Sequence, residues 1–281
     1  MTQTELKNLK KLSVTARMDI LDMVYSAQSG HPGGSLSATE ILVYLYFKQM
    51  NIDPNNPKWE KRDRLVLSKG HVTPILYSCL ARKGYFPKEE LLNFRKYGSI
   101  LQGHPDMKNI PGVDMSTGSL GQGLSCAVGM AYAGKKEKNQ FNVYAIVGDG
   151  ETQEGQIWEA LMFAGNHKLN NLCVIIDYNH IQICGFVEDV NNPAPLDKKL
   201  EAFGFDVAIA DGHDFESLES AFNKFKTTDK PLAIIAETIK GKGVSFMENS
   251  ANWHGKAPNK ELYDKAIEEL KMTKKQLEEA E

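Results

Sequence analysis

The chain has 281 residues, of which 42% are hydrophobic and 25% are charged, as in an ordinary soluble globular protein with a sizeable core. Its formal net charge of −3 gives no reason to expect nucleic acid or an anionic membrane as a partner. Without a run of about 18 apolar residues no transmembrane helix is expected, and the N-terminal MTQTELKNLKKL lacks the apolar core of a signal peptide.

Helical periodicity dominates the first half of the chain. Apolar residues recur at helical spacing from the N-terminus and predict one long helix that ends at about Ser29. Two further helices are expected at about 37–49 and 73–82. The segment 121–136 is rich in Ala, Gly and Met, which is typical of a helix packed closely against a sheet.

Short Val- and Ile-rich runs predict five strands, with helices between them. The strands are expected at Arg64–Leu67, Asn142–Val147, Leu172–Asp177, Asp206–Ala210 and Ala233–Thr238. The intervening helices are expected at about 154–167, 196–203 and 215–225. Strands that alternate with helices predict an α/β fold with a mostly parallel β-sheet and helices on both faces.

We expect a single domain over residues 1–281, because no long linker, internal repeat or low-complexity tract divides the chain. Toward the C-terminus the composition becomes charged and predicts a helical tail at about 257–281. Asn259 and Thr273 are the expected N-caps, and Thr273 with Gln276 has the spacing of a capping box.

The four cysteines predict no metal site. Cys79, Cys126, Cys173 and Cys184 form no CxxC pair, and each has apolar neighbours in the sequence. Buried free thiols are the simplest interpretation, which fits a reducing, cytoplasmic location. The spacing does not favour zinc.

Polar residues follow two successive predicted strands. Asp149 ends the first strand within Gly-Asp-Gly, and Asn179 follows the next. A helix between the strands makes a βαβ unit, so both ends point to one sheet edge, where ligands bind in such folds. Two hard oxygen ligands suit Mg²⁺ or Ca²⁺, with phosphate oxygens completing the shell. A helix that opens near Gln153 would offer N–H groups to the same phosphates, and Gly150 allows close approach. The alternative is an aspartate N-cap and an unrelated asparagine turn.

Four of the seven histidines lie in loops marked by glycine or proline, namely His31, His71, His104 and His254. Their common setting favours a binding or catalytic site over isolated structural roles. The loop at 117–123, TGSLGQG, leads into a further helix. It does not match a dinucleotide fingerprint, because no apolar strand precedes it, so a nicotinamide site is not expected.

The motifs SGHPGGSLS, RDRLVLSKGH, GHPD, STGSLGQGLS, GDGETQEGQIWEA, DYNHIQICG, DGHD and WHGKAP occur in this order along the chain. Together they resemble the N-terminal, diphosphate-binding half of transketolase, over nearly the whole chain. The resemblance implies the thiamine diphosphate-binding fold, with thiamine diphosphate and Mg²⁺ (or Ca²⁺) as cofactors. It implies transfer of a two-carbon ketol unit from a ketose phosphate to an aldose acceptor, as in the pentose phosphate pathway.

The resemblance also implies roles for individual residues. The metal would be held by Asp149, the Asn179 side chain and the Ile181 carbonyl. The cofactor would be contacted by His71, Gly118, Ser119, Leu120, Gly150, Asn179 and His254. The residues facing the sugar hydroxyls and the reacting carbonyl would be His31, His104 and His254. Glu154 and Glu159 match catalytic-network carboxylates buried between the two cofactor sites of a dimer, or they lie on a solvated helix face.

Three positions depart from the family pattern. Ser119 stands where many members have proline, Cys184 where aspartate is frequent, and His180 where glycine is usual. His180 would place an extra imidazole near the metal or merely fill the surface. None of the three removes a group that the chemistry requires.

A glutamate against the pyrimidine ring activates the cofactor in this family. It belongs to a second domain, and this sequence stops at about the point where that domain would begin. The chain therefore resembles the N-terminal subunit of a split transketolase. The implied partner is a C-terminal pyrimidine-binding subunit, in an α₂β₂ heterotetramer. The alternatives are the α subunit of a 2-oxoacid dehydrogenase, a deoxyxylulose phosphate synthase-like enzyme and a non-catalytic cofactor-binding module.

Overall fold

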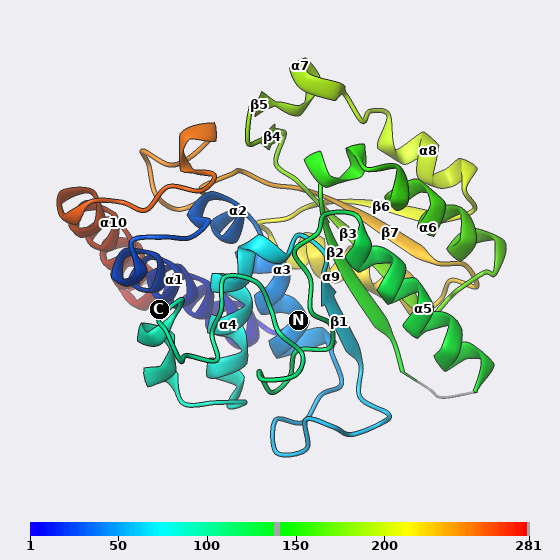
Figure 1. The fold of residues 1–281 in the computed structure, drawn as a ribbon, viewed down its shortest axis with the longest axis horizontal. Coiled ribbons are helices and arrows are strands. Elements are labelled where there is room, and N and C mark those ends of the chain that lie inside the picture. The colour runs from blue at the N-terminus through cyan, green and yellow to red at the C-terminus, as the bar shows by residue number, and fades with distance from the viewer. Residues whose placement is uncertain (138–140, 280–281) are drawn as a thin grey trace.

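A parallel β-sheet lies at the centre of the molecule, with helices on both sides (Figure 1). The structure is a computed structural model and describes residues 1–137 and 141–279. Five strands pair in the order β1-β2-β3-β7-β6. They are β1 (Arg64–Leu67), β2 (Val143–Gly148), β3 (Leu172–Tyr178), β6 (Asp206–Asp211) and β7 (Leu232–Glu237). The expected fold class is confirmed, and each expected strand is present with its ends within one residue.

The strands are continuous apolar runs because both faces of the sheet are covered. Tyr144 and Ile146 of β2 belong to a core shared with α1, α3, α4 and α9. Ala145 and Val147 point to the opposite face and belong to a second core with α5, α6 and α8. Such alternation along a strand follows from its two-residue period.

The helices match most of the expected ranges. They are α1 (Gln3–Ala27), α2 (Pro32–Ser37), α3 (Thr39–Tyr44), α4 (Thr73–Lys83), α5 (Gln122–Lys136), α6 (Gly155–Asn166), α7 (Val187–Asn191), α8 (Leu196–Ala202), α9 (Phe215–Phe225) and α10 (Lys260–Glu279). The single helix expected at 37–49 is wrong. Pro32 starts α2 five residues earlier, Ala38 separates α2 from α3, and a π-helical turn forms Leu45–Gln49.

The C-terminal helix α10 packs along α1 (Figure 1). Tyr263 stacks on Tyr25 at 4.1 Å between ring centroids, and its hydroxyl donates to Asp22 at 2.6 Å. Asn259 caps the helix as expected, since its Oδ1 accepts from Leu262 N at 2.9 Å. Thr273 is not an N-cap: it lies inside α10, where its hydroxyl donates to the Glu269 carbonyl.

The cysteine expectation holds for only two positions. Cys79 and Cys173 are buried, but Cys126 is half-buried and Cys184 is exposed, and all four are free. Cys184 lies between β4 (Ile181–Gln182) and β5 (Gly185–Phe186), which form a hairpin outside the main sheet (Figure 1). The hydrophobicity of neighbouring residues in the sequence does not indicate that a segment leaves the core in this way.

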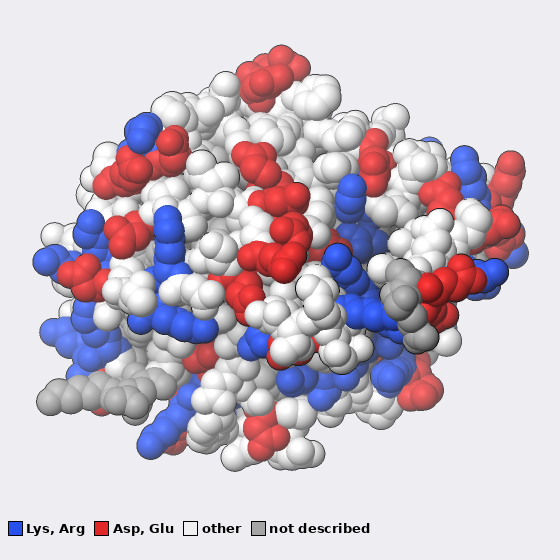
Figure 2. All heavy atoms as spheres, turned by 180° about the vertical axis from the view of Figure 1, so that it is seen from behind, with Lys and Arg blue, Asp and Glu red and all other residues white. Residues whose placement is uncertain are grey.

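Charged side chains of both signs cover the face shown in Figure 2. Acidic side chains run through the middle of this face, with Lys and Arg on both sides. Among the helices of the described residues, none combines the length and apolarity needed to span a membrane.

Candidate active site

The carboxyl ends of β2 and β3 place two acidic residues side by side. Gly148 pairs with Asp177 in the sheet, and Asp149 follows directly. Asp149 caps a 3₁₀ turn, Gly150–Gln153, with its Oδ1 accepting from Gly150 N at 2.7 Å. Its Oδ2 accepts from the backbone N–H of His180 at 2.5 Å. The structure therefore brings the turn after β3 onto the Asp149 carboxylate.

This turn carries the other two expected metal ligands. The Asn179 amide oxygen accepts from Ile181 N at 3.2 Å, and its Nδ2 lies 3.3 Å from Asp177 Oδ2. The Ile181 carbonyl accepts from the ammonium of Lys240 at 2.8 Å. All three oxygen groups lie in one buried region, and a lysine is directed at the carbonyl.

Two buried lysines and two buried aspartates surround this region. Lys69 pairs with Asp177, which also accepts from Ser37 Oγ at 2.6 Å. Burial would raise the pKa of Asp177, but the Lys69 ammonium and hydroxyl donors hold it below its usual value. Burial and the charge of Asp177 raise the pKa of Asp149 to about 6. Burial and the charge of Lys69 lower the pKa of Lys240 to about 8.

These groups fit a divalent cation bound together with a diphosphate. No three His, Cys, Asp or Glu side chains within residues 1–137 and 141–279 gather closely enough to form a metal site by themselves. A cation on Asp149, Asn179 and the Ile181 carbonyl would therefore complete its shell with oxygens from a bound anion. The ammonium groups of Lys69 and Lys240 supply the positive charge that such an anion requires.

The helix expected to open near Gln153 begins slightly later. The 3₁₀ turn occupies 150–153, and α6 starts at Gly155. Gly150 is required for packing, since a Cβ there would lie 2.9 Å from Cβ of Gln182. Its close approach is therefore to the β4–β5 hairpin.

Three of the four loop histidines meet above the charged cluster. The ring centroids are 5.0 Å apart for His31 and His71, 5.4 Å for His31 and His254, and 5.2 Å for His71 and His254. His31 precedes α2, His71 lies in a 3₁₀ turn after β1, and His254 follows another short turn near the C-terminus. Three distant segments thus converge on one imidazole cluster.

The cluster is neutral at physiological pH. Burial, followed by the charge of Arg95, lowers the pKa of His31 to about 4, and burial with Lys240 lowers the pKa of His254 to about 3. The Lys240 ammonium lies 3.1 Å from Nδ1 of His254. Nδ1 of His31 is buried without a hydrogen-bond partner within the described structure. Neutral imidazoles can both donate and accept hydrogen bonds, as handling a sugar hydroxyl or carbonyl requires.

His104 and the 117–121 loop form the rim of the site. His104 is exposed and packs against Gly118. A Cβ added to Gly118 would lie 2.8 Å from Cδ2 of His104. Gly118 has φ +149°, and Ser119 and Leu120 are exposed to solvent. The structure thus brings His104 to the loop rather than into the imidazole cluster.

Glu154 and Glu159 lie exposed near the start of α6. Glu154 packs against Gly121: a Cβ added to Gly121 would lie 3.0 Å from the Cβ of Glu154. In this chain alone both carboxylates face solvent. Their place in a buried network between two sites stays a prediction that concerns an assembly.

His180 fills the surface instead of facing the cation region. Its ring lies against that of Tyr178, with 4.1 Å between centroids and 42° between the ring planes, and its Nε2 lies 2.9 Å from Glu237 Oε2. The side chain is 47% exposed, and φ is +65°, which explains why glycine suits this position. Only its backbone N–H reaches Asp149.

Four buried charged residues at this edge were missed by the sequence reasoning: Lys69, Glu151, Asp177 and Lys240. Each lies at or just beyond the carboxyl end of a strand, and that position was the available signal. A lysine or acid there is aimed at the edge where ligands bind in parallel sheets.

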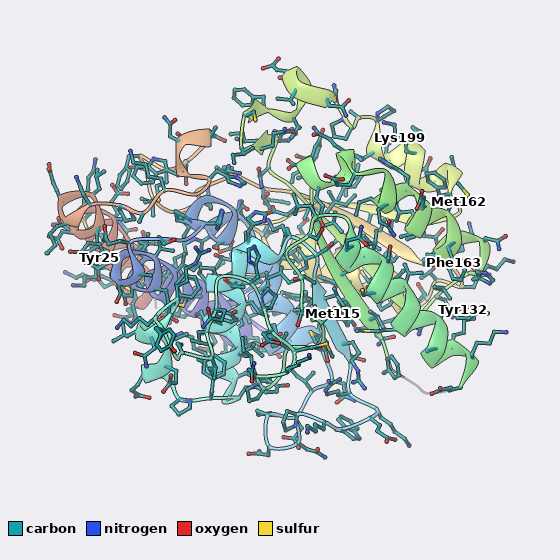
Figure 3. The ribbon with its side chains drawn as sticks, in the orientation of Figure 1. Tyr25, Met115, Tyr132, Met162, Phe163 and Lys199 are labelled. Atoms are coloured by element: carbon teal, nitrogen blue, oxygen red, sulfur yellow. The ribbon has the colours of Figure 1, made fainter. Side chains whose placement is uncertain are left out.

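An apolar face lies on the C-terminal halves of α5 and α6 (Figure 3). Tyr132 and Phe163 make an edge-to-face contact with 5.4 Å between ring centroids. The ring centroid of His167 lies 4.2 Å from that of Phe163. Met162 is 58% and Phe163 is 42% exposed, and Gly129 is open to solvent. Aromatic and methionine side chains left exposed together are typical of an interaction surface.

Comparison with known proteins gives a consistent result. Residues 9–278 match the family described as transketolase, thiamine diphosphate binding domain. The chain is 49% identical over 242 residues to the 6-deoxy-6-sulfo-D-fructose transketolase subunit SqwG of Clostridium sp. (strain MSTE9), covering 86% of this chain and 88% of that protein. It is 42% identical over 267 residues to an apulose-4-phosphate transketolase subunit of Phocaeicola vulgatus, covering 95% of each.

The fold is similar to that of longer proteins. The transketolase structure from Campylobacter jejuni subsp. jejuni matches with a TM-score of 0.90 at 36% identity, covering 99% of this chain and 46% of that one. Transketolase of Homo sapiens is 42% identical over 276 residues, covering 95% of this chain and 43% of that protein. The chain thus spans nearly the full length of the two subunit-type relatives and less than half of these longer ones.

Proposed function

The chain belongs to the family of transketolase thiamine diphosphate binding domains, and on that premise we propose that it is the N-terminal subunit of a split transketolase. The proposed reaction is transfer of a two-carbon ketol unit from a ketose phosphate, or a similar anionic keto sugar, to an aldose acceptor. The observation that carries the proposal is the near-complete coverage of two relatives that are themselves named as transketolase subunits. The names of those relatives refer to a sulfonated and a phosphorylated sugar, which supports a donor with an anionic end.

Thiamine diphosphate supplies, when bound, the carbanion that adds to the donor carbonyl. Asp149, the Asn179 side chain and the Ile181 carbonyl would hold Mg²⁺, or Ca²⁺ in its place. Lys69 and Lys240 would face the diphosphate, because both ammonium groups are buried beside those oxygens. The same cofactor would also be contacted by His71, Gly118, Ser119, Leu120 and Gly150.

The histidines would act on the sugar. His31 and His254 have neutral rings in contact. At pH 7 each ring can therefore accept a proton from the sugar without first releasing one to the solvent. His104, exposed at the rim, would bind substrate hydroxyls as they enter. Hydrogen bonds to the reacting oxygen would stabilise the charge that develops during C–C cleavage.

A separate pyrimidine-binding subunit would complete the site, most simply in an α₂β₂ assembly with two cofactor sites. The exposed Met162 and Phe163 support a protein partner on the α5–α6 face. Glu154 and Glu159, exposed near the start of α6, would become buried in that assembly. The four free cysteines support a reducing, cytoplasmic location.

The test is to assay the purified chain with thiamine diphosphate, Mg²⁺, a ketose phosphate and an aldose, with and without a candidate pyrimidine-binding chain from an adjacent reading frame. We expect no turnover by the chain alone and ketol transfer by the mixture. Robust turnover by the single chain would contradict the split-enzyme proposal. Cofactor binding without turnover in a verified complex would favour the non-catalytic module.

A further inference from the structure

Glu151 is a buried carboxylate in the turn that follows β2. It is 3% exposed, although it directly follows Gly150 in a glycine-marked turn. Its Oε1 accepts from Ser68 Oγ at 2.6 Å and from Gly121 N at 2.9 Å. Its Oε2 accepts from Gly148 N at 3.1 Å. One side chain therefore joins its own turn to two other segments of the chain.

Each of these segments carries residues that we assign to the cofactor. Ser68 is followed by Lys69, whose ammonium lies in the buried charge cluster. Gly121 closes the loop 118–120, and Gly148 precedes Asp149. A displacement of the Glu151 carboxylate would thus move lysine, loop and metal-ligand positions together.

The same segments are packed without spare room. A Cβ at Gly70 would lie 2.5 Å from Thr117 Oγ1, and one at Gly123 would lie 2.7 Å from the Cα of Ser68. The Thr117 hydroxyl donates to the Leu67 carbonyl at 2.6 Å. Since these backbones touch, hydrogen bonds at their common centre fix how the loops are placed relative to one another.

We propose that Glu151 is a positioning residue, which holds the three segments in the arrangement that binds the diphosphate end of the cofactor without contacting it. This inference rests on the proposed function. A carboxylate is suited to the task because it accepts at both oxygens, whereas glutamine would turn an NH₂ group toward Ser68 and Gly121 or toward Gly148.

A buried carboxylate could also serve stability alone, and the chain offers a matched control. Asp63 is 5% exposed and accepts from the backbone N–H groups of Asn51 at 2.9 Å and Asn142 at 2.8 Å. It precedes β1 at the amino edge of the sheet, opposite the candidate site. Asp63→Asn should therefore lower stability without changing the cofactor loops.

The experiment compares wild type, Glu151→Gln, Ser68→Ala and Asp63→Asn as full-length chains, each alone and in complex with the candidate pyrimidine-binding chain. Calorimetry measures the dissociation constant for pyrophosphate with Mg²⁺, and for thiamine diphosphate with Mg²⁺. The unfolding temperature without ligand reports stability. We expect Glu151→Gln to weaken binding of both probes by about 10- to 100-fold, the usual effect of losing an outer-shell partner of a metal site. Ser68→Ala, which removes one of three contacts, should weaken binding several-fold, and Asp63→Asn should leave it unchanged.

Wild-type affinity in Glu151→Gln would overturn the inference, as would an equal loss of affinity in Asp63→Asn. If Glu151→Gln does not fold, Ser68→Ala decides the question by the same criterion. Failure of the wild-type chain to bind either probe even in the complex would instead contradict the proposed cofactor site, so the two proposals fail in different ways.

Discussion

Replacing Glu40 with glutamine should destabilise the chain far more than a typical surface change. Glu40 lies on α3. Its carboxylate accepts hydrogen bonds from both terminal nitrogens of Arg17, at 2.6 and 2.7 Å, and from Nδ1 of His213 at 2.8 Å. Nε2 of the same imidazole accepts from Ile239 N at 2.8 Å, so Nδ1 is the nitrogen that donates to Glu40. The change would leave the buried Arg17 guanidinium opposite a neutral amide.

The magnitude follows from the shifted pKa. Burial alone would raise the pKa of Glu40, but Arg17 and His213 lower it from 4.5 to about 2. A shift of that size corresponds to about 3 kcal/mol of stability at neutral pH. Removing one partner of a buried ion pair costs about 3–5 kcal/mol in other proteins, which agrees.

The measurement is the free energy of unfolding in urea for wild type, Glu40→Gln and the surface control Glu5→Gln, whose partner Lys48 is exposed. Because the folded-state pKa of Glu40 is depressed, its contribution is present above about pH 4.5 and is lost as the pH falls toward about 2. The difference between wild type and Glu40→Gln should therefore shrink on acidification. A difference below about 1 kcal/mol at pH 7, or one unchanged at pH 3, would refute the reasoning.

Three other predictions follow from the site. Asp149→Ala should abolish Mg²⁺-dependent thiamine diphosphate binding in the assembled enzyme while leaving the circular dichroism spectrum unchanged; unaltered affinity by calorimetry would contradict the proposed metal-binding role of Asp149. His31→Ala and His254→Ala should each lower kcat/KM of the assembled enzyme by about 10²–10⁴, and wild-type rates would leave that imidazole a purely structural role. Met162→Glu should weaken assembly with the pyrimidine-binding chain in sedimentation velocity, because it places a charge on the apolar α5–α6 face; an unchanged complex would locate the interface elsewhere.

The strands were predictable because burial on both faces of the sheet produces continuous apolar runs in the sequence. β2 and β3 carry buried, mostly apolar residues rich in Val and Ile at successive positions, as strands at the centre of a covered parallel sheet do. Asn259 was predictable as a cap because capping depends on the three residues that follow it. Thr273 has the same local spacing, but nothing near it breaks the helix, so α10 continues through it.

The candidate site was predictable in its motifs but not in its connections. The glycine- and proline-marked loops identify His31, His71 and His254, and only the fold shows that their rings touch. Lys240 and Glu151 look like ordinary surface charges in the sequence, since charged residues are mostly exposed. Their burial depends on partners far along the chain, such as Ile181 for Lys240 and Ser68 for Glu151. The residues next to Lys240 and Glu151 in the sequence do not identify those distant partners.

The pairing of the first helix with the last segments has a consequence for how the chain is made. Arg17 on α1 donates to the carbonyl of Lys242, 225 residues later, and α10 covers the same helix. At elongation rates of about 5–20 residues per second, α1 waits roughly 10 to 45 seconds on the ribosome for these contacts. During that interval the apolar stripe of α1 lacks its final cover. Slow translation, or a shortage of chaperones that shield nascent chains, should therefore reduce the yield of this protein before any folded molecule exists.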